Sequence, residues 1–203
     1  MKKVLFALVA MSLLFTACED GNDDFIKLKE VDDVCTMMDD LKLMEHCYEE
    51  YDVKKDGKVS MEEAAAVRDF NIWNYEISSI KGIEYFPNIE VLHIIHTYYL
   101  TECNLMNNKK LKSILLGDMD SFMATNVSDL NFSKLTNLSR VYLGCVAIKN
   151  LDLANGNAIE VNLQWGRKVD TPPACTIWLK AGQILDEDST FDENYNYTIK
   201  YVD

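Results

Sequence analysis

The segment from Asp52 to Glu63 carries oxygen-bearing side chains at a spacing that suits a calcium ion. Calcium binds about six to eight oxygens, and a short loop can supply them by wrapping around one point. Gly57 would make the sharp turn, and Glu63 would approach from the following helix with both carboxylate oxygens. The residues expected to supply ligands are Asp52, Asp56, Lys58 through its backbone carbonyl, Ser60 and Glu63.

These twelve residues follow much of the EF-hand pattern, with one departure. Lys54 stands at position 3, where the pattern has Asp, Asn or Ser, and an ammonium group offers no acceptor and repels the ion. Two interpretations stay open, a weak calcium site and a metal-free loop. In both cases, the loop would link two helices, the first capped by Asp40 and the second running from Met61 to Arg68. Calcium is therefore a possible ligand, and no cofactor is required.

No arrangement of residues predicts catalysis. His46, His93 and His96 are the only histidines, and none lies in a nucleophile, zinc or phosphate-loop motif. We therefore expect a protein that is not an enzyme.

The first 18 residues predict export. Two lysines precede an apolar run from Val4 to Phe15, and small residues precede Cys18, as in a signal peptide. The tetrapeptide ending at Cys18 resembles a lipobox, although Phe15 stands where an aliphatic residue is usual. The alternative is an ordinary signal peptide with an incidental cysteine. The lipobox resemblance implies that Cys18 carries the lipid that anchors the mature protein to the outer membrane.

The acidic segment after Cys18 resembles the sorting tag of surface lipoproteins in Bacteroides-like bacteria, which implies display outside the outer membrane. The whole chain has a formal charge of -13. Removing residues 1–17 takes away two lysines and no acid, which leaves 18 bases, 33 acids and a charge of -15. Such a chain repels phosphate backbones, so nucleic acid is not expected as a partner.

Five cysteines follow Cys18, and this odd number leaves at least one thiol without an intramolecular partner. Cys35 and Cys47 are twelve residues apart in the segment expected to be helical. They could form a disulfide or remain two buried thiols.

An apolar triplet at positions i, i+3 and i+5 recurs through residues 67–179, and its middle members step by 22, 22, 27, 20 and 16 residues. The six triplets are Val67/Phe70/Ile72, Ile89/Leu92/Ile94, Leu111/Ile114/Leu116, Leu138/Val141/Leu143, Ala158/Val161/Leu163 and Ala174/Ile177/Leu179. A second triplet lies between successive first ones, as in Val127/Leu130/Phe132, and the long step indicates an insertion around 118–123. The last two positions of each triplet predict a short strand with both side chains turned inward. Because no single repeat can bury its own apolar row, the repeats must stack into a solenoid.

The segment 138–154 resembles the repeat of leucine-rich-repeat lipoproteins of Bacteroides-like bacteria. Segments 56–67 and 80–92 resemble the N-terminal entry of that family, and 177–203 resembles its C-terminal cap. The resemblance implies an α/β-type leucine-rich-repeat solenoid with a short parallel sheet on its concave face. The asparagine usual after each strand is absent here, so the turns must be held in another way. The expected parts are a signal peptide (1–17), a lipidated cysteine with an acidic tether (18–30), a helical N-terminal cap (31–66), the solenoid (67–180) and a small β C-terminal cap (181–203).

The strand register also predicts which side chains face outward on the concave side, and many of them are apolar or aromatic. Grouped apolar side chains on one surface are typical of contact sites. The expected ligand-binding residues are Trp73, Val91, His93, Ile95, Leu115, Arg140, Tyr142, Asn162 and Trp178. We expect a protein or peptide partner at this face. The alternative is a carbohydrate-binding accessory protein of a nutrient-uptake system, since Trp and Tyr also stack on sugars.

Overall fold

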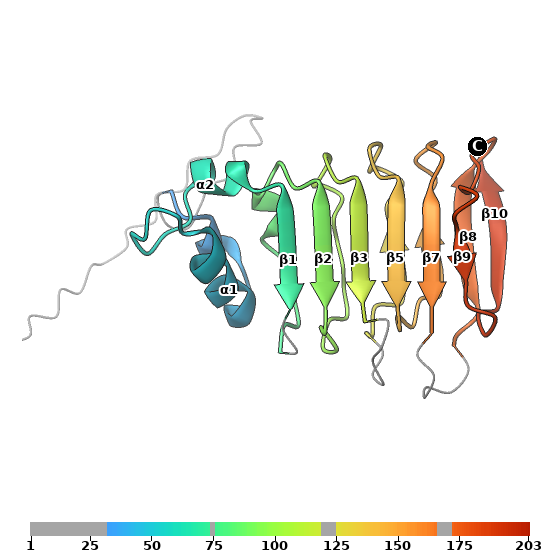
Figure 1. Ribbon diagram of the computed structural model, residues 1–203, viewed down its shortest axis with the longest axis horizontal. Coiled ribbons are helices and arrows are strands. Elements are labelled where there is room, and N and C mark those ends of the chain that lie inside the picture. Colours follow the sequence, from blue (N-terminus) through green and yellow to red (C-terminus); the bar gives the residue numbers. More distant parts are fainter. Residues whose placement is uncertain (1–31, 74–75, 119–124, 166–171) are drawn as a thin grey trace, which may run out of the picture.

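The computed structural model describes residues 32–73, 76–118, 125–165 and 172–203, and it shows a solenoid of about five turns built from parallel strands (Figure 1). One side of every turn contributes a strand to a six-stranded sheet in the order β1-β2-β3-β5-β7-β9. Its strands are β1 (Asp69–Trp73), β2 (Val91–Ile95), β3 (Ser113–Gly117), β5 (Arg140–Gly144), β7 (Glu160–Gln164) and β9 (Thr190–Phe191). The expected solenoid is confirmed.

The inward positions of this sheet are those that the triplets predict. Phe70 pairs with Leu92, Leu92 with Ile114, and the same row continues through Val141 and Val161. Each of these five side chains is fully buried. A one-residue slip in register would turn the whole row into solvent, so burial of the row fixes how the turns align.

Another sheet lies on the opposite side of the turns, and the second triplets around Leu130 and Leu151 supply two of its strands. It consists of β4 (Asp129–Asn131), β6 (Asn150–Asp152), β8 (Cys175–Lys180) and β10 (Tyr197–Val202), in the order β10-β8-β6-β4. The prediction that Ala174/Ile177/Leu179 forms a sixth strand of the first sheet is therefore wrong. The step of 16 residues before this triplet is shorter than a full turn. It leads from β7 in the first sheet to β8 in the opposite one. β9 takes the sixth place in the first sheet.

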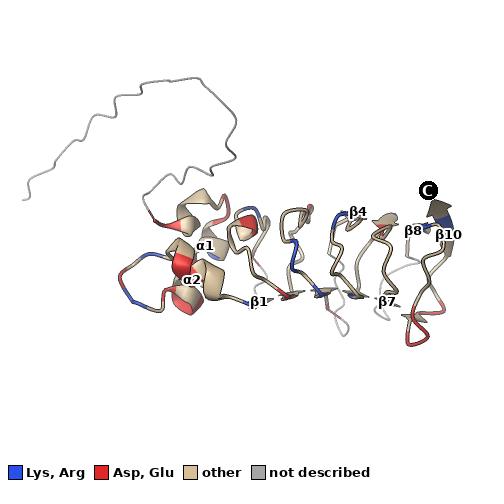
Figure 2. Ribbon diagram, turned by 90° about the horizontal axis from the view of Figure 1, so that it is seen from above, with Lys and Arg blue, Asp and Glu red and all other residues tan. Residues whose placement is uncertain are grey.

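The turns stack in a nearly straight row, so the outward face of the six-stranded sheet is close to flat rather than concave (Figure 2). Strands on both sides explain this shape, because neighbouring strands are about 4.8 Å apart on either side. In the described part of the chain, α-helices lie only at the N-terminal end. None of them is long and apolar enough to cross a membrane.

At the N-terminal end, a 3-10 helix η1 (Val34–Met37), α1 (Leu41–Tyr51) and α2 (Met61–Ala66) pack beside β1. Asp40 caps α1 by accepting hydrogen bonds from the backbone of Lys42 and Leu43. A second short 3-10 helix, η2 (Ile83–Tyr85), lies between β1 and β2. Tyr51 from α1 contacts the rings of Phe70 and Phe86, with centroids 4.9 Å and 5.5 Å away. These aromatic contacts cover the first turn of the core.

Side-chain amides hold successive turns together in place of the missing asparagine ladder. Asn108 donates to the carbonyl of Ile83 at 3.1 Å, and Asn155 donates to that of Leu135 at 3.0 Å. Gln183 donates to the carbonyl of Leu153 at 2.9 Å. Each bond spans 20 to 30 residues and satisfies a backbone group of the preceding turn.

Residues 181–203 extend both sheets by one strand each, through β9 and β10, instead of forming a separate cap. The expected signal peptide, Cys18 and tether lie outside the described residues, as does most of the insertion expected around 118–123.

Candidate functional site

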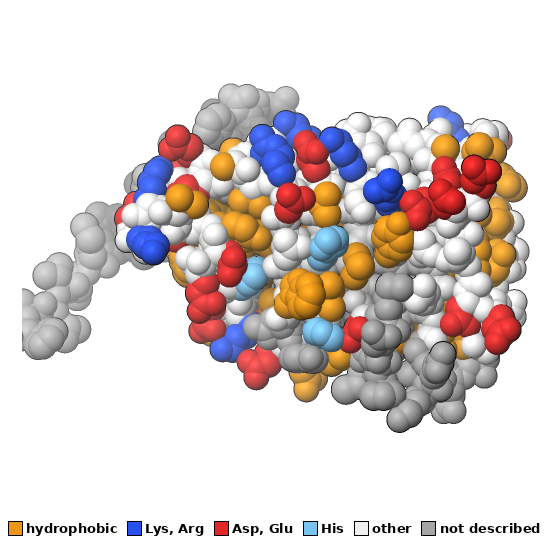
Figure 3. Space-filling view, viewed as in Figure 1, with side chains coloured by type: hydrophobic (Ala, Val, Ile, Leu, Met, Phe, Trp, Pro, Cys, Tyr) orange, Lys and Arg blue, Asp and Glu red, His pale blue; other side chains and the backbone are white. Residues whose placement is uncertain are grey.

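We use the term outer face for the outward side chains of β1, β2, β3, β5 and β7. Eight of the nine residues expected to bind a ligand lie there, namely Trp73, Val91, His93, Ile95, Leu115, Arg140, Tyr142 and Asn162. Hydrophobic side chains gather in the middle of this face, with histidines beside them (Figure 3). The parallel register places Asn71, His93, Leu115, Tyr142 and Asn162 in one row across the strands.

The N-terminal half of the outer face is apolar and partly open to solvent. Trp73 is 65% exposed. Val91, His93, Ile95 and Leu115 are half-buried around it on the next two strands. A large exposed indole beside half-buried aliphatic side chains can lose much apolar area from water when a partner covers it.

The C-terminal half of the outer face is polar and internally bonded. Glu160 accepts a hydrogen bond from the Tyr142 hydroxyl at 2.6 Å. Its carboxylate also lies 3.2 Å from the Arg140 Nε and 3.3 Å from the Asn162 Nδ2. The bond to Glu160 raises the pKa of Tyr142. Because these groups hold one another, this half presents a fixed polar surface.

Sequence reasoning missed an aromatic group at the edge of the outer face, just after β2. His96 adopts a left-handed backbone conformation with φ of 58° and packs edge-on against Trp73, with ring centroids 6.4 Å apart. Its Nδ1 lies 2.7 Å from the Asp118 carboxylate. Tyr99 is 64% exposed nearby in sequence. The sequence signal for this group was the run of one His and two Tyr within residues 96–99. The left-handed backbone turn at His96 could not be predicted from the residue types.

Trp178 was assigned to the wrong face. It lies on β8, where it points outward from the four-stranded sheet, next to Asp152 on β6 and Lys200 on β10. The Lys200 ammonium sits 5.0 Å from the centroid of the indole ring. A hollow here is lined by Asp129, Leu130, Asn131, Asn150, Asp152, Trp178 and Val202. Trp178 therefore belongs to a separate polar surface on the opposite side of the molecule.

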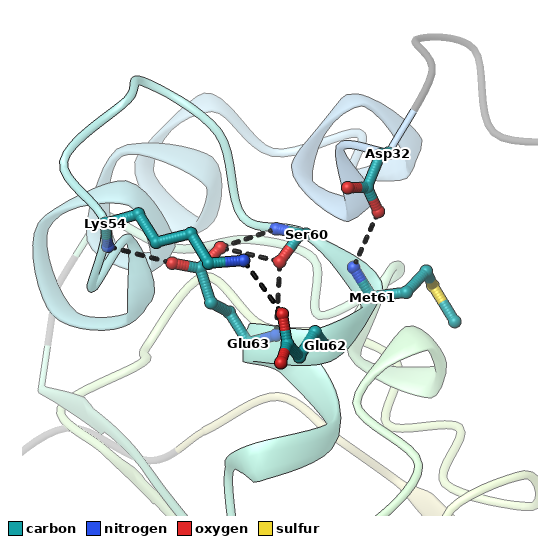
Figure 4. A network of polar contacts seen from close by, with 6 residues as sticks. All are labelled: Asp32, Lys54, Ser60, Met61, Glu62 and Glu63. Carbon is teal, nitrogen blue, oxygen red and sulfur yellow. Dashed lines mark hydrogen bonds and ion pairs between the residues drawn. The ribbon is translucent and has the colours of Figure 1, made fainter.

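The loop between α1 and α2 is held closed by hydrogen bonds between its own groups. Asp52 accepts hydrogen bonds from the backbone of Asp56 and Gly57, and Gly57 has a φ of +82°. Glu63 accepts from Lys54 N at 2.9 Å through one oxygen and from Ser60 N at 3.0 Å through the other. Figure 4 shows both oxygens of Glu63 engaged in this way.

The bonds to the Ser60 and Lys54 backbone lower the pKa of Glu63 to about 2. The two oxygens that would bind calcium thus already hold the loop together, and Lys54 turns its ammonium toward Glu62, 2.9 Å away. Among the residues the structure describes, no three Asp, Glu, His or Cys side chains converge as metal ligands. The arrangement favours the metal-free interpretation, and calcium binding stays a prediction.

Cys35 and Cys47 are both fully buried and unbridged, one in η1 and the other in α1. Burial, followed by a hydrogen bond from Cys35, raises the pKa of the Cys47 thiol. The structure holds Cys35 and Cys47 as two buried thiols, and the alternative of a disulfide stays a prediction. Cys103, Cys145 and Cys175 are also buried and unbridged.

No protein-family model matches the chain, and no curated protein matches it significantly. The functional argument therefore depends on the fold and the surface described above.

Proposed function

We propose that this protein is a cell-surface lipoprotein of the leucine-rich-repeat type whose outer face binds a protein or peptide without catalysis. The observation that carries the proposal is the 65% exposed Trp73 among half-buried Val91, His93, Ile95 and Leu115. Aromatic anchors ringed by less exposed contacts are typical of the energetic centres of protein interfaces.

The polar half of the face would supply specificity. Arg140, Tyr142 and Asn162 keep donors and acceptors in fixed positions around Glu160, so little side-chain freedom is lost when a partner docks. Protein interfaces usually combine such apolar and polar parts.

The leucine-rich-repeat assignment is supported by the strand-forming triplets, their steps of 20 to 27 residues along the first five turns and the solenoid they build. Lipid anchoring at Cys18 is supported by the sequence before it. We expect a Cys18→Ser variant to leave the membrane fraction. A variant that stays membrane-bound would contradict lipidation.

A second candidate is a carbohydrate-binding accessory lipoprotein of a nutrient-uptake system. The hollow around Trp178 favours it, because an indole flanked by Asn131, Asn150 and Asp152 offers a stacking surface and hydrogen-bonding groups together. Lys200 now covers part of that indole, so a sugar would have to displace it.

Binding screens separate the two candidates. Residues 19–203, which contain every described element, are applied to arrays of proteins and of glycans, beside Trp73→Ala and Trp178→Ala variants. We expect protein hits that Trp73→Ala weakens at least about tenfold and Trp178→Ala leaves unchanged, since loss of an aromatic anchor costs about 2 kcal/mol or more. Glycan binding that only Trp178→Ala abolishes would overturn the first proposal in favour of the second.

A further inference from the structure

The two ends of the solenoid differ in what covers their terminal strands. Helix α1 and its aromatic contacts cover the first turn, whereas β10 is the outermost strand of the four-stranded sheet. Within the described chain, β10 is hydrogen-bonded only to β8. Hydrophobic side chains also gather along this end of the molecule (Figure 3). An open edge strand is a template for pairing with another strand.

The ladder between β8 and β10 shows which backbone groups are open. Cys175 N donates to Asn196 O at 2.9 Å, and Ala181 N donates to Val202 O at 2.7 Å. In a parallel ladder, alternate residues of a strand bond to the same neighbour. The even-numbered residues of β10 therefore face β8, and the N–H and C=O groups of Tyr197, Ile199 and Tyr201 point away from it.

The same three residues carry three of the four apolar or aromatic side chains of the strand. They pair in register with the buried Cys175, Ile177 and Leu179, so they lie on the core side of the sheet. Yet Tyr201 is 61% exposed and Tyr197 is 39% exposed. The open edge thus combines unpaired backbone groups with apolar side chains that have no further turn over them in the described structure.

We propose that β10 pairs antiparallel with β10 of a second copy of this chain, about a two-fold axis at Ile199. This register sets Ile199 opposite Ile199 and Tyr197 opposite Tyr201 of the second copy. All outward N–H groups of both strands then meet carbonyl partners, and core-side residues face core-side residues. A shift by one residue would set core-side residues against solvent-side ones, so only shifts by an even number of residues keep the two faces aligned.

The charges along β10 also suit pairing with a second copy in this register. Lys200 is the only charged residue in β10, and the register places it opposite Thr198 of the second copy rather than opposite another lysine. Only the exposed parts of Tyr197 and Tyr201, 39% and 61% of each, remain to be buried together with Ile199 and the strand backbone. This area is smaller than the roughly 800 Å² per partner of a standard interface, so we expect a weak dimer. Because both copies are acidic, dimerisation should strengthen as salt screens their repulsion.

The test measures molecular mass by sedimentation equilibrium from low-micromolar to several hundred micromolar protein. It uses the chain from residue 18 with Cys18→Ser, since the described core packs entirely within residues 34–195. We expect a concentration-dependent dimer. Ile199→Lys should weaken it at least about tenfold by placing two ammonium groups on the axis. Val53→Lys, at an exposed apolar site at the other end of the molecule, should leave it unchanged.

A second pair of variants tests the register and does not depend on an apolar position. Thr198→Glu faces Lys200 of the second copy and should tighten the dimer several-fold, whereas Thr198→Lys should loosen it by a similar factor. Circular dichroism and the melting temperature check that each variant folds. A monomer at every concentration, or a dimer that Ile199→Lys leaves intact, would overturn the proposal, and equal affinity in the two Thr198 variants would overturn the register.

Discussion

Glu63 is the residue whose charge holds the helical end of the protein in place. Its carboxylate joins Lys54 at the start of the loop to Ser60 at the start of α2. Ser60 also accepts a hydrogen bond from Glu63 N, so the two residues form a reciprocal capping box. The loop thereby positions α2, which leads directly into β1.

This role predicts a defined pH dependence. The pKa of Glu63 is lowered from 4.5 to about 2 in the folded chain, so its stabilising effect is complete above pH 4.5 and is lost as the pH falls toward 2. We expect Glu63→Gln to lower the free energy of unfolding by about 1–3 kcal/mol at neutral pH. The difference from wild type should shrink toward zero as the pH falls toward 2. Urea unfolding at several pH values measures it, and a difference independent of pH would contradict the assignment.

At the scale of the elements, β3 and β5 approach each other closely where both strands end in glycine. Gly117 ends β3 with a φ of +92°, and a Cβ built there would come within 1.9 Å of the carbonyl oxygen of Gly144. Gly182 has a similar φ of +82°, but nothing lies within 4 Å of the corresponding Cβ position. The two glycines therefore share a similar backbone conformation and differ in the space around them, so substitutions at both separate steric clash from backbone strain.

We expect Gly182→Ala to cost about 1–2 kcal/mol through backbone strain alone. Gly117→Ala should cost more than about 3 kcal/mol, because the two strands must also separate. Chemical denaturation of both variants gives the comparison. If the two variants lost equal stability, the close approach of β3 and β5 would not be as described.

The loop between α1 and α2 offers a test by gain of function. Lys54→Asp supplies the missing ligand at position 3 and removes a positive charge, so Glu63 can turn from the backbone toward an ion. We expect millimolar calcium to raise the melting temperature of this variant by several degrees and to leave wild type unchanged. A wild-type rise that a chelator reverses would instead establish a native calcium site.

For the molecule as a whole, residue patterns predicted the solenoid and the outer face better than its far side. Burial of every second residue repeats with each turn, so Phe70, Leu92, Ile114, Val141 and Val161 could be aligned from spacing alone. The same apolar pattern marks strands on either side of a solenoid. Hence Ile177 was placed in the wrong sheet, and Trp178 with it.

Other features had no local signal. The left-handed turn at His96 and the pairing of its ring with Asp118 depend on how neighbouring turns stack. The straight shape also follows from the second sheet, which the α/β expectation did not include. The side-chain amides that hydrogen-bond to neighbouring turns belong to Asn108, Asn155 and Gln183. None of these residues stands at the position where the repeat pattern expects asparagine.

The central claim is that the outer face binds a protein, and cross-linking tests it most directly. A photo-reactive amino acid is placed at Leu115 on the outer face or, as a control, at Thr176 on the opposite sheet, in cells that produce the protein. Both positions are half-buried and point outward. We predict a discrete protein adduct from position 115 upon irradiation, lost when Trp73→Ala is added, and none from position 176. Adducts from position 176 alone, or none from either position, would contradict the account.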